Sequence, residues 1–175
     1  MKKDFVSIIV PTLNASRTIN STLNSIVKQS FKKWEVIIID GHSTDNTISI
    51  VKKFQNNKFK VYFLSKKKGL AEARYLGIKK SRGNYIAFLD ADDIWKKNKL
   101  KFQLKYMKKN NALFSATKYT ILNKKFHFIE KVYETKVDFD YLLYNRPICN
   151  SSVLIDKNTI LSVAKKFRYN IYAED

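Results

Sequence analysis

The chain has 175 residues, 45% hydrophobic and 28% charged, which is enough for one folded domain and excludes a wholly disordered protein. A single cysteine, Cys149, excludes a disulfide framework and a zinc site built from cysteines. The 34 Lys and Arg against 15 Asp and Glu give a net charge of +19, which favours phosphate-bearing partners but is also explained by lysines on solvated faces.

The first half of the chain alternates β-branched apolar runs with segments of helical periodicity. Strands are predicted at 5–10, 34–39, 61–64 and 85–89, and helices over 19–27, 48–54 and 70–80. Asn14 or Ser16 is expected to cap the first of these helices, and Asp45 the second. Near-continuous apolar strands separated by helices predict an α/β fold with a mostly parallel central sheet and helices on both faces.

The pattern changes after Asp93, although no linker or second-domain boundary follows. A basic helix is predicted over 96–109, and its apolar stripe of Leu100, Leu104 and Met107 is expected in the core. Further along, we predict a hairpin within 112–135, a helix near 138–144, a strand near 152–155 and a helix over about 157–167.

Polar side chains gather in the loops that follow the predicted parallel strands. Right-handed crossovers place these loops on one edge of the sheet, at 11–14, 40–45, 65–69 and 90–93. Asp40 is expected to point into the crevice at this edge and to accept hydrogen bonds from a base or a sugar.

Three carboxylates, Asp90, Asp92 and Asp93, lie within four residues and repel one another. A divalent cation with oxygen ligands, shared with substrate phosphates, would compensate them. The alternative is a capping cluster at the start of the basic helix. Arg74 is expected near the crevice, where it could meet a pyrophosphate or pair with Asp40, or else lie on the surface.

Several other classes of site lack sequence support. Neither GxGxxG nor GxxxxGK[ST] occurs, which disfavours dinucleotide-binding and P-loop proteins. His42 is expected to be an ordinary exposed loop histidine. Cys149 and His127 have no third partner that would make them a nucleophile–base pair.

Two long segments resemble one family: VSIIVPTLNASRTINSTLNSIVKQSFKKWEVIIIDGHSTDNT and KGLAEARYLGIKKSRGNYIAFLDADDIWKKNKLKFQ. Together they are similar to the family 2 inverting glycosyltransferases, which have the GT-A nucleotide-sugar fold. The resemblance is strong over about residues 5–105. It implies transfer of a sugar, with inversion, from a nucleotide-sugar donor (UDP-linked) to a glycan or lipid-linked acceptor, in polysaccharide biosynthesis of the cell envelope. A divalent cation, Mn²⁺ or Mg²⁺, is implied as cofactor.

The resemblance also implies roles for individual residues. Pro11, Thr12 and Asn14 would lie against the nucleotide base, Asp40 would bind the base, Arg74 would lie on the nucleotide side, Asp90 would touch the ribose or metal, and Asp92 would be the principal metal ligand of the DxD motif. Residues 150–155 resemble the segment that lines the acceptor side. The final Ala173-Glu174-Asp175 resembles the ED motif of the family, whose aspartate is the catalytic base; here that residue is Asp175.

Family members continue past the ED motif, whereas this chain stops there. We therefore interpret residues 1–175 as one glycosyltransferase domain that is truncated at its C-terminus. Residues 1–95 form its nucleotide-binding part and 96–175 its acceptor-side part. The alternative is a truncated nucleotide-sugar-binding domain that is catalytically weak or inactive.

A basic nucleic-acid or membrane-surface protein is a third hypothesis, and it rests on the net charge alone. It would require lysines clustered on one face with exposed aromatic residues between them. We expect no nucleic-acid partner, because the aromatic residues that can be placed are expected in the core: Phe31, Trp34, Phe88 and Phe102. A peripheral membrane association remains compatible with a lipid-linked acceptor.

Localisation follows from what the N-terminus and the apolar runs lack. The longest apolar runs, at 6–10 and 36–40, are far shorter than the roughly 20 residues of a membrane span. The N-terminus has no signal-peptide pattern. These features predict a cytoplasmic protein, compatible with a peripheral position at the inner face of the membrane.

Overall fold

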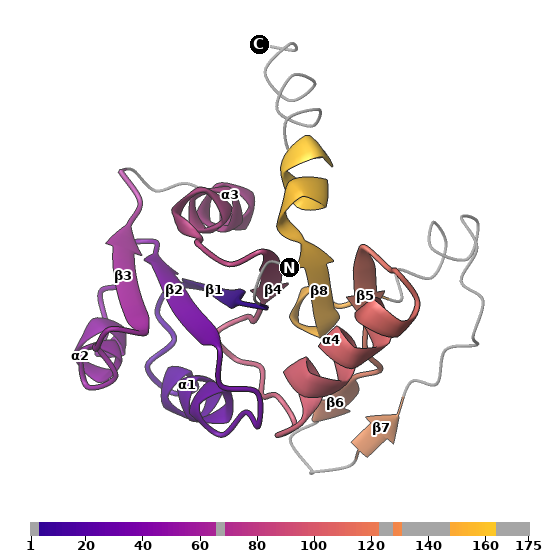
Figure 1. Ribbon diagram of the computed structural model, residues 1–175. Helices are drawn as coiled ribbons and strands as arrows, with labels where there is room; N and C mark the ends of the chain where they lie inside the picture. Colours follow the sequence, from indigo (N-terminus) through magenta and orange to yellow (C-terminus); the bar gives the residue numbers. More distant parts are fainter. Residues whose placement is uncertain (1–3, 66–68, 123–127, 131–147, 164–175) are drawn as a thin grey trace, which may run out of the picture.

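A computed structural model describes residues 4–65, 69–122, 128–130 and 148–163 (Figure 1). The strands are β1 (Val6–Thr12), β2 (Trp34–Asp40), β3 (Phe59–Phe63), β4 (Tyr85–Phe88), β5 (Phe114–Ala116), β6 (Thr120–Leu122), β7 (Phe128–Glu130) and β8 (Val153–Asp156). The helices are α1 (Ile19–Val27), α2 (Thr47–Lys52), α3 (Leu70–Lys80), α4 (Lys99–Lys109) and the 3₁₀ turn η1 (Asn150–Ser152), and residues 157–163 are also helical. Among the described helices, none is both long enough and apolar enough to cross a bilayer.

The main sheet has six strands in the order β3-β2-β1-β4-β8-β5. The first four strands are parallel, β8 runs antiparallel to β4, and β5 runs antiparallel to β8. The register pairs Thr12 with Asp40, so the last residues of β1 and β2 lie side by side. The sheet is therefore mostly parallel, as the sequence predicts, and its carboxyl edge brings together the predicted polar loops at 11–14, 40–45 and 90–93. Most of the loop predicted at 65–69 lies outside the described residues.

Helices cover both faces of this sheet. On one face, Ile8 and Val10 of β1 belong to a buried cluster with residues of α1, α2 and α4. The next position, Ile9, packs on the other face with Ile78 of α3 and with the helix that follows β8. Alternate side chains of one strand thus enter two cores, because successive residues of a strand point to opposite faces. Figure 1 shows this three-layer arrangement, with α1 and α4 below the sheet and α3 above it.

The second half of the chain differs in part from the prediction. The hairpin is confirmed for β6 and β7, which pair antiparallel. The preceding apolar run does not extend that hairpin, because β5 pairs with β8 in the main sheet. The helix predicted near 138–144 lies outside the described residues. The strand predicted near 152–155 is β8, one residue later.

The α4 helix confirms one expectation and contradicts another. Leu100, Leu104 and Met107 are buried, as predicted from their spacing. Phe102 was expected in the core but is 62% exposed, because its position on the helix lies opposite to this stripe. Trp34 and Phe88 are buried as expected, and Phe31 is partly buried.

Candidate functional site

The loops after β1 and β2 are bonded to each other at the carboxyl edge of the sheet. The backbone N–H of Asn14 donates to Ser43 Oγ at 2.9 Å, and Asn14 Oδ1 accepts from the backbone N–H of Thr44 at 2.8 Å. Asn14 has a positive φ of 50°, a conformation that asparagine tolerates better than most residues. The side chain predicted as a helix cap thus joins two loops, and α1 begins after Thr18 instead.

Asp45 also connects the loop after β2 to the loop after β1. Its carboxylate accepts from the backbone N–H of Ser16 at 3.0 Å and from that of Thr47 at 2.9 Å. The hydrogen bond from the Thr47 hydroxyl is the largest influence on the pKa of Asp45 and, with those from Ser16, lowers it well below its ordinary value. Asp45 is therefore a stable anion that stabilises the turn before α2, as predicted, although Asn46 is the residue that caps the helix.

Asp40 lies at the end of β2 and is buried, with 1% of its surface exposed. Its Oδ1 accepts from the Ser43 hydroxyl at 2.6 Å and its Oδ2 from the Ser43 backbone N–H at 2.9 Å. A carboxylate has about four acceptor positions, so these two bonds fix its orientation and leave acceptor capacity. Beside it, Thr12 Oγ1 is buried without a hydrogen-bond partner among the described residues, and Pro11 is buried in β1.

Asp90 begins the acidic loop, residues 90–93, which follows β4. Its Oδ1 accepts from Arg74 Nη2 at 2.7 Å, and its backbone N–H donates to Ser151 Oγ at 3.0 Å. Of the two carboxylates considered, Arg74 pairs with Asp90 and not with Asp40, because α3 presents it toward the loop after β4. Arg74 Nε is buried and has no partner among the described residues.

The other two carboxylates of the acidic loop differ in exposure. Asp92 is exposed, whereas Asp93 is partly buried with Cys149 Sγ 3.9 Å from its Oδ2. Burial raises the pKa of Asp93, and the neighbouring charges of Asp92 and Asp90 add to this rise. The sequence predicts repulsion among the three carboxylates of the loop, and the ion pair of Asp90 with Arg74 compensates part of it.

The described residues include no group of three or more His, Cys, Asp or Glu side chains placed to hold a metal ion. The oxygen donors of Asp90 and Asp92 are of the type that Mg²⁺ and Mn²⁺ prefer. These residues fit a divalent cation that takes further ligands from a bound diphosphate. Asp175, the expected base, lies outside the described residues.

Two contacts that sequence reasoning missed join Trp95 and α4 to η1. Trp95 Nε1 donates to the backbone carbonyl of Ser151 at 2.7 Å, and Gln103 Nε2 donates to that of Ser152 at 3.0 Å. The available signal was Gln103 itself, a polar residue next to Leu104 on the buried stripe of α4. Residues 150–152 are thereby held against the loop that carries Asp90.

Lys99 is the most deeply buried cation of the described residues, 8% exposed. Its ammonium donates to Gln103 Oε1 at 2.6 Å and lies 4.3 Å from the centre of the Trp95 ring. Burial lowers the pKa of Lys99 to about 7, so this residue is partly uncharged at neutral pH. From the sequence, Lys99 is not distinguished from the other lysines of the basic helix.

The fold and this loop edge define the class of protein as a GT-A glycosyltransferase domain. Residues 7–165 match the family described as glycosyl transferase family 2, and the chain belongs to that family.

Three relatives illustrate the similarity. The UDP-Glc:α-D-GlcNAc-diphosphoundecaprenol β-1,3-glucosyltransferase WfgD of Escherichia coli is 37% identical over 155 residues, covering 89% of this chain and 61% of WfgD. TarS of S. aureus, solved in complex with UDP-GlcNAc, is 26% identical with a TM-score of 0.74 over 90% of this chain and 47% of that one. The mannosyltransferase PcManGT from Pyrobaculum calidifontis, solved with GDP-Man and Mn²⁺, is 26% identical with a TM-score of 0.56 over 61% of this chain and 33% of that one. The chain thus spans about three fifths of the length of WfgD.

Proposed function

We propose that this protein transfers a sugar, with inversion, from a UDP-linked donor to a lipid-linked or other glycan acceptor of the cell envelope, with the help of a divalent cation. The observation that carries the proposal is the meeting of Asp40, Thr12 and the acidic loop on one edge of a mostly parallel sheet. The named substrates of WfgD and the UDP-GlcNAc bound to TarS support a UDP-linked donor.

The base end of the donor site is assigned to the loops after β1 and β2. Uracil presents one N–H donor between two carbonyl acceptors. Asp40 has spare acceptor capacity for that N–H, and Thr12 Oγ1 is a buried hydroxyl without a partner among the described residues. Pro11 and Asn14 would flank the base, because β1 and the joined loops hold them beside these two residues.

The diphosphate end is assigned to the acidic loop and α3. Asp92 would be the principal protein ligand of the cation, with Asp90 next to the cation or the ribose. When bound, the cation supplies positive charge that stabilises the departing nucleoside diphosphate. Arg74 orients Asp90 through its ion pair and faces the diphosphate from the nucleotide side.

Transfer itself requires a base that removes the proton of the acceptor hydroxyl as this oxygen attacks the anomeric carbon. An attack from the face opposite to the nucleotide inverts the configuration at that carbon. We assign the base to Asp175, donor binding to residues 1–95 and acceptor binding to 96–175. The hydrogen bonds that Trp95 and Asp90 form with Ser151 of η1 would keep these two parts in register.

Calorimetric titration with UDP tests the donor site, in Mn²⁺ and then in EDTA. We expect Asp92→Asn to weaken binding about tenfold or more in Mn²⁺, the order of one charge-assisted contact, and to have little effect in EDTA. Asp4→Asn is the matched control, because it removes a carboxylate charge before β1, at the opposite edge of the sheet. Absence of UDP binding to the unaltered protein, or equal loss in both variants, would overturn the assignment.

A second titration separates binding from transfer. Asp175→Asn is expected to leave the Kd for UDP within about twofold and to abolish transfer to a GlcNAc-diphosphate lipid, since a positioned base contributes about 10² to 10⁴ in rate. If the unaltered chain binds UDP-glucose but forms no product with this acceptor, the alternative of a donor-binding domain without transfer is favoured.

A further inference from the structure

The outer face of α4 carries two exposed aromatic side chains between lysines. Phe102 is 62% and Tyr106 is 59% exposed, one helical turn apart. Lys101, Lys105 and Lys109 are exposed beside them. At 100° per residue these five positions lie within about 140° of the helix circumference, so they form one continuous strip. We call these five residues the α4 outer face.

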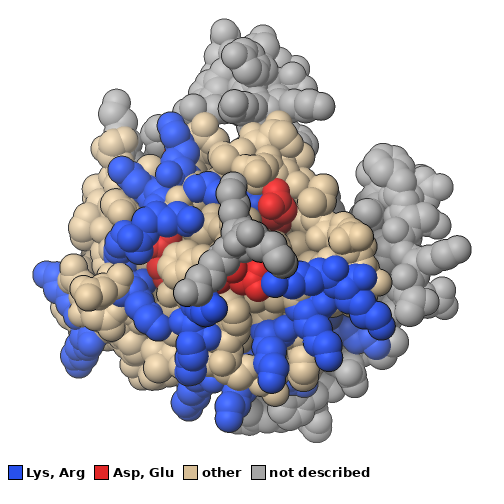
Figure 2. All heavy atoms as spheres, viewed as in Figure 1, with Lys and Arg blue, Asp and Glu red and all other residues tan. Residues whose placement is uncertain are grey.

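This face is strongly and uniformly basic. Between Asp93 and Glu130 the sequence has ten lysines and no acidic residue. Among the described residues, Lys108 pairs with Asp4, whereas the three lysines of the α4 outer face form no ion pair. Figure 2 shows Lys and Arg gathered over the part of the surface where α4 lies. Such a surface attracts a partner with a dense array of negative charge.

We propose that the α4 outer face docks on an anionic lipid bilayer, with the lysines near lipid phosphates and with Phe102 and Tyr106 in the headgroup region. Aromatic rings suit this interface, because an apolar ring enters the acyl boundary while a tyrosine hydroxyl stays hydrated. Lysine suits it too, because its apolar stem follows the ring surface and its ammonium reaches the phosphates.

A bilayer fits this face better than a nucleic acid does. The strip runs along the outside of a single helix, whereas single-stranded nucleic acid is held in a basic groove with stacked bases. The exposed rings of α4 therefore match the flat surface of a bilayer better than they match a single-stranded nucleic acid.

The position of α4 gives the contact a consequence for the proposed reaction, and this step rests on the proposed function. The helix begins at Lys99, shortly after the acidic loop, and Gln103 of this helix donates a hydrogen bond to the backbone carbonyl of Ser152 in η1. A bilayer against the α4 outer face would bring η1, which lies in the proposed acceptor-binding part, close to the membrane, where a lipid-linked acceptor lies.

Sedimentation with lipid vesicles tests the docking face in the full chain. The vesicles are phosphatidylcholine alone or an equal mixture with phosphatidylglycerol. The triple variant Lys101→Gln, Lys105→Gln, Lys109→Gln is expected to bind mixed vesicles about a hundredfold more weakly, since each of the three lysines near an anionic surface contributes about fivefold. The double variant Phe102→Ser, Tyr106→Ser is expected to bind mixed vesicles about tenfold or more weakly, and its binding should keep the salt dependence of the unaltered protein.

The matched control removes three exposed lysines elsewhere: Lys52→Gln, Lys53→Gln, Lys79→Gln. It is expected to stay within about threefold of the unaltered protein, because α2 and α3 do not share the α4 outer face. The proposal is overturned if this control loses as much as the α4 triple variant, or if the aromatic double variant binds mixed vesicles normally. It is also overturned if the unaltered protein binds single-stranded oligonucleotides and ignores vesicles. UDP titration of the same variants keeps this result separate from the donor site, because none of these residues belongs to it.

Discussion

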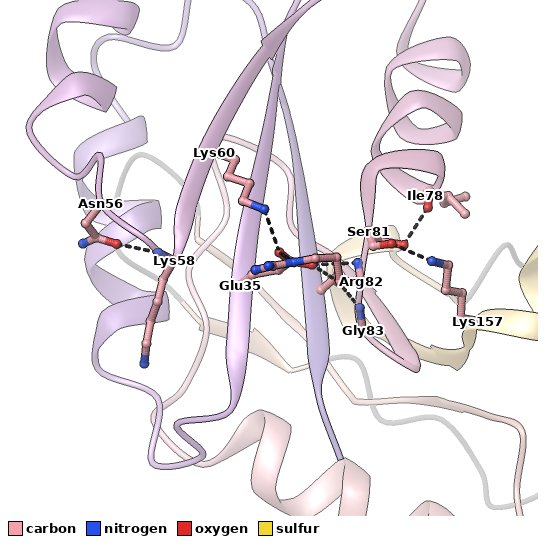
Figure 3. A network of polar contacts seen from close by, with 10 residues as sticks. Glu35, Asn56, Lys58, Lys60, Ile78, Ser81, Arg82, Gly83 and Lys157 are labelled. Atoms are coloured by element: carbon pink, nitrogen blue, oxygen red, sulfur yellow. Dashed lines mark hydrogen bonds and ion pairs between the residues drawn. The ribbon is translucent and has the colours of Figure 1, made fainter. Parts of the chain in front are cut away.

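Glu35 is a carboxylate buried at the start of β2, whereas the acidic loop follows the end of the neighbouring parallel strands. Figure 3 shows its contacts with Lys60 and Arg82. Its Oε1 accepts from Ser7 Oγ at 2.8 Å and from the Arg82 backbone N–H at 2.7 Å, and its Oε2 accepts from Arg82 Nε at 2.9 Å. Burial by itself would raise the pKa of Glu35, but the hydrogen bonds from Arg82 and Ser7 outweigh it and lower that pKa. The anion thus ties the turn before β4 to β1 and β2.

Replacement of Glu35 by Gln is expected to lower the free energy of unfolding by about 2 kcal/mol at pH 7, because charge-assisted hydrogen bonds to a buried group are lost. The contribution of a carboxylate with a lowered pKa is complete above its ordinary value of about 4.5 and disappears as pH falls through the folded-state pKa. We therefore measure the free energy of unfolding of the unaltered protein and of Glu35→Gln by urea titration. The difference between them should be large at pH 7 and smaller at a pH below 4.5. A difference independent of pH would contradict this assignment. Lys60→Gln is the control, expected to cost below about 1 kcal/mol because its 3.7 Å contact is partly exposed.

At the scale of elements, α3 approaches β1 closely because position 77 has no side chain. A Cβ added at Gly77 would overlap the side chain of Ile9, which is buried in the sheet. The same helix carries Arg74, whose ion pair reaches Asp90. The packing of one helix on one strand therefore also positions a residue of the candidate site.

Gly77→Ala is expected to destabilise the protein by about 1 to 3 kcal/mol, because an overpacked contact forces α3 away from the sheet. Displacement of Arg74 should weaken UDP binding in the same variant. Urea unfolding and UDP titration measure the two effects. Gly69→Ala, at the N-terminus of the same helix, has open space around its Cβ and a φ of −70°, so we expect a cost below about 1 kcal/mol. Equal costs at the two glycines would refute the packing argument.

At the scale of the whole molecule, the excess of positive charge opposes folding. With a net charge of +19 and four ion pairs among the described residues, most lysines repel one another across the surface. Salt screens such repulsion over roughly 10 Å at 0.1 M. We expect Tm to rise by a few degrees from low salt to about 0.3 M NaCl, as followed by circular dichroism. The α4 triple lysine variant should show a smaller rise, and a Tm that falls with salt would contradict the idea.

Much of this architecture was predictable because local patterns carry it. Buried parallel strands are continuous apolar runs, so 34–39 was recognised within one residue of β2. The edge strand β3 begins two residues earlier than expected, at Phe59, because its extent follows pairing with β2 and most of its residues are only partly buried. The prediction for Phe102 is wrong because it follows the usual burial of aromatic residues, whereas the spacing of Leu100, Leu104 and Met107 places Phe102 on the opposite side of the helix.

The sequence by itself determined the alternation of strands and helices, the shared edge of the polar loops, and the family. The first two properties depend on side-chain periodicity and on the handedness of crossovers, both of which are local or general. The family follows from the resemblance carried by two long sequence segments. Only the tertiary structure decided that Arg74 pairs with Asp90, that Ser43 orients Asp40, that β5 joins β8, and that η1 is held by Trp95 and Gln103. Several of these contacts join residues far apart in the chain, and all depend on the register and packing that bring the groups within hydrogen-bonding distance.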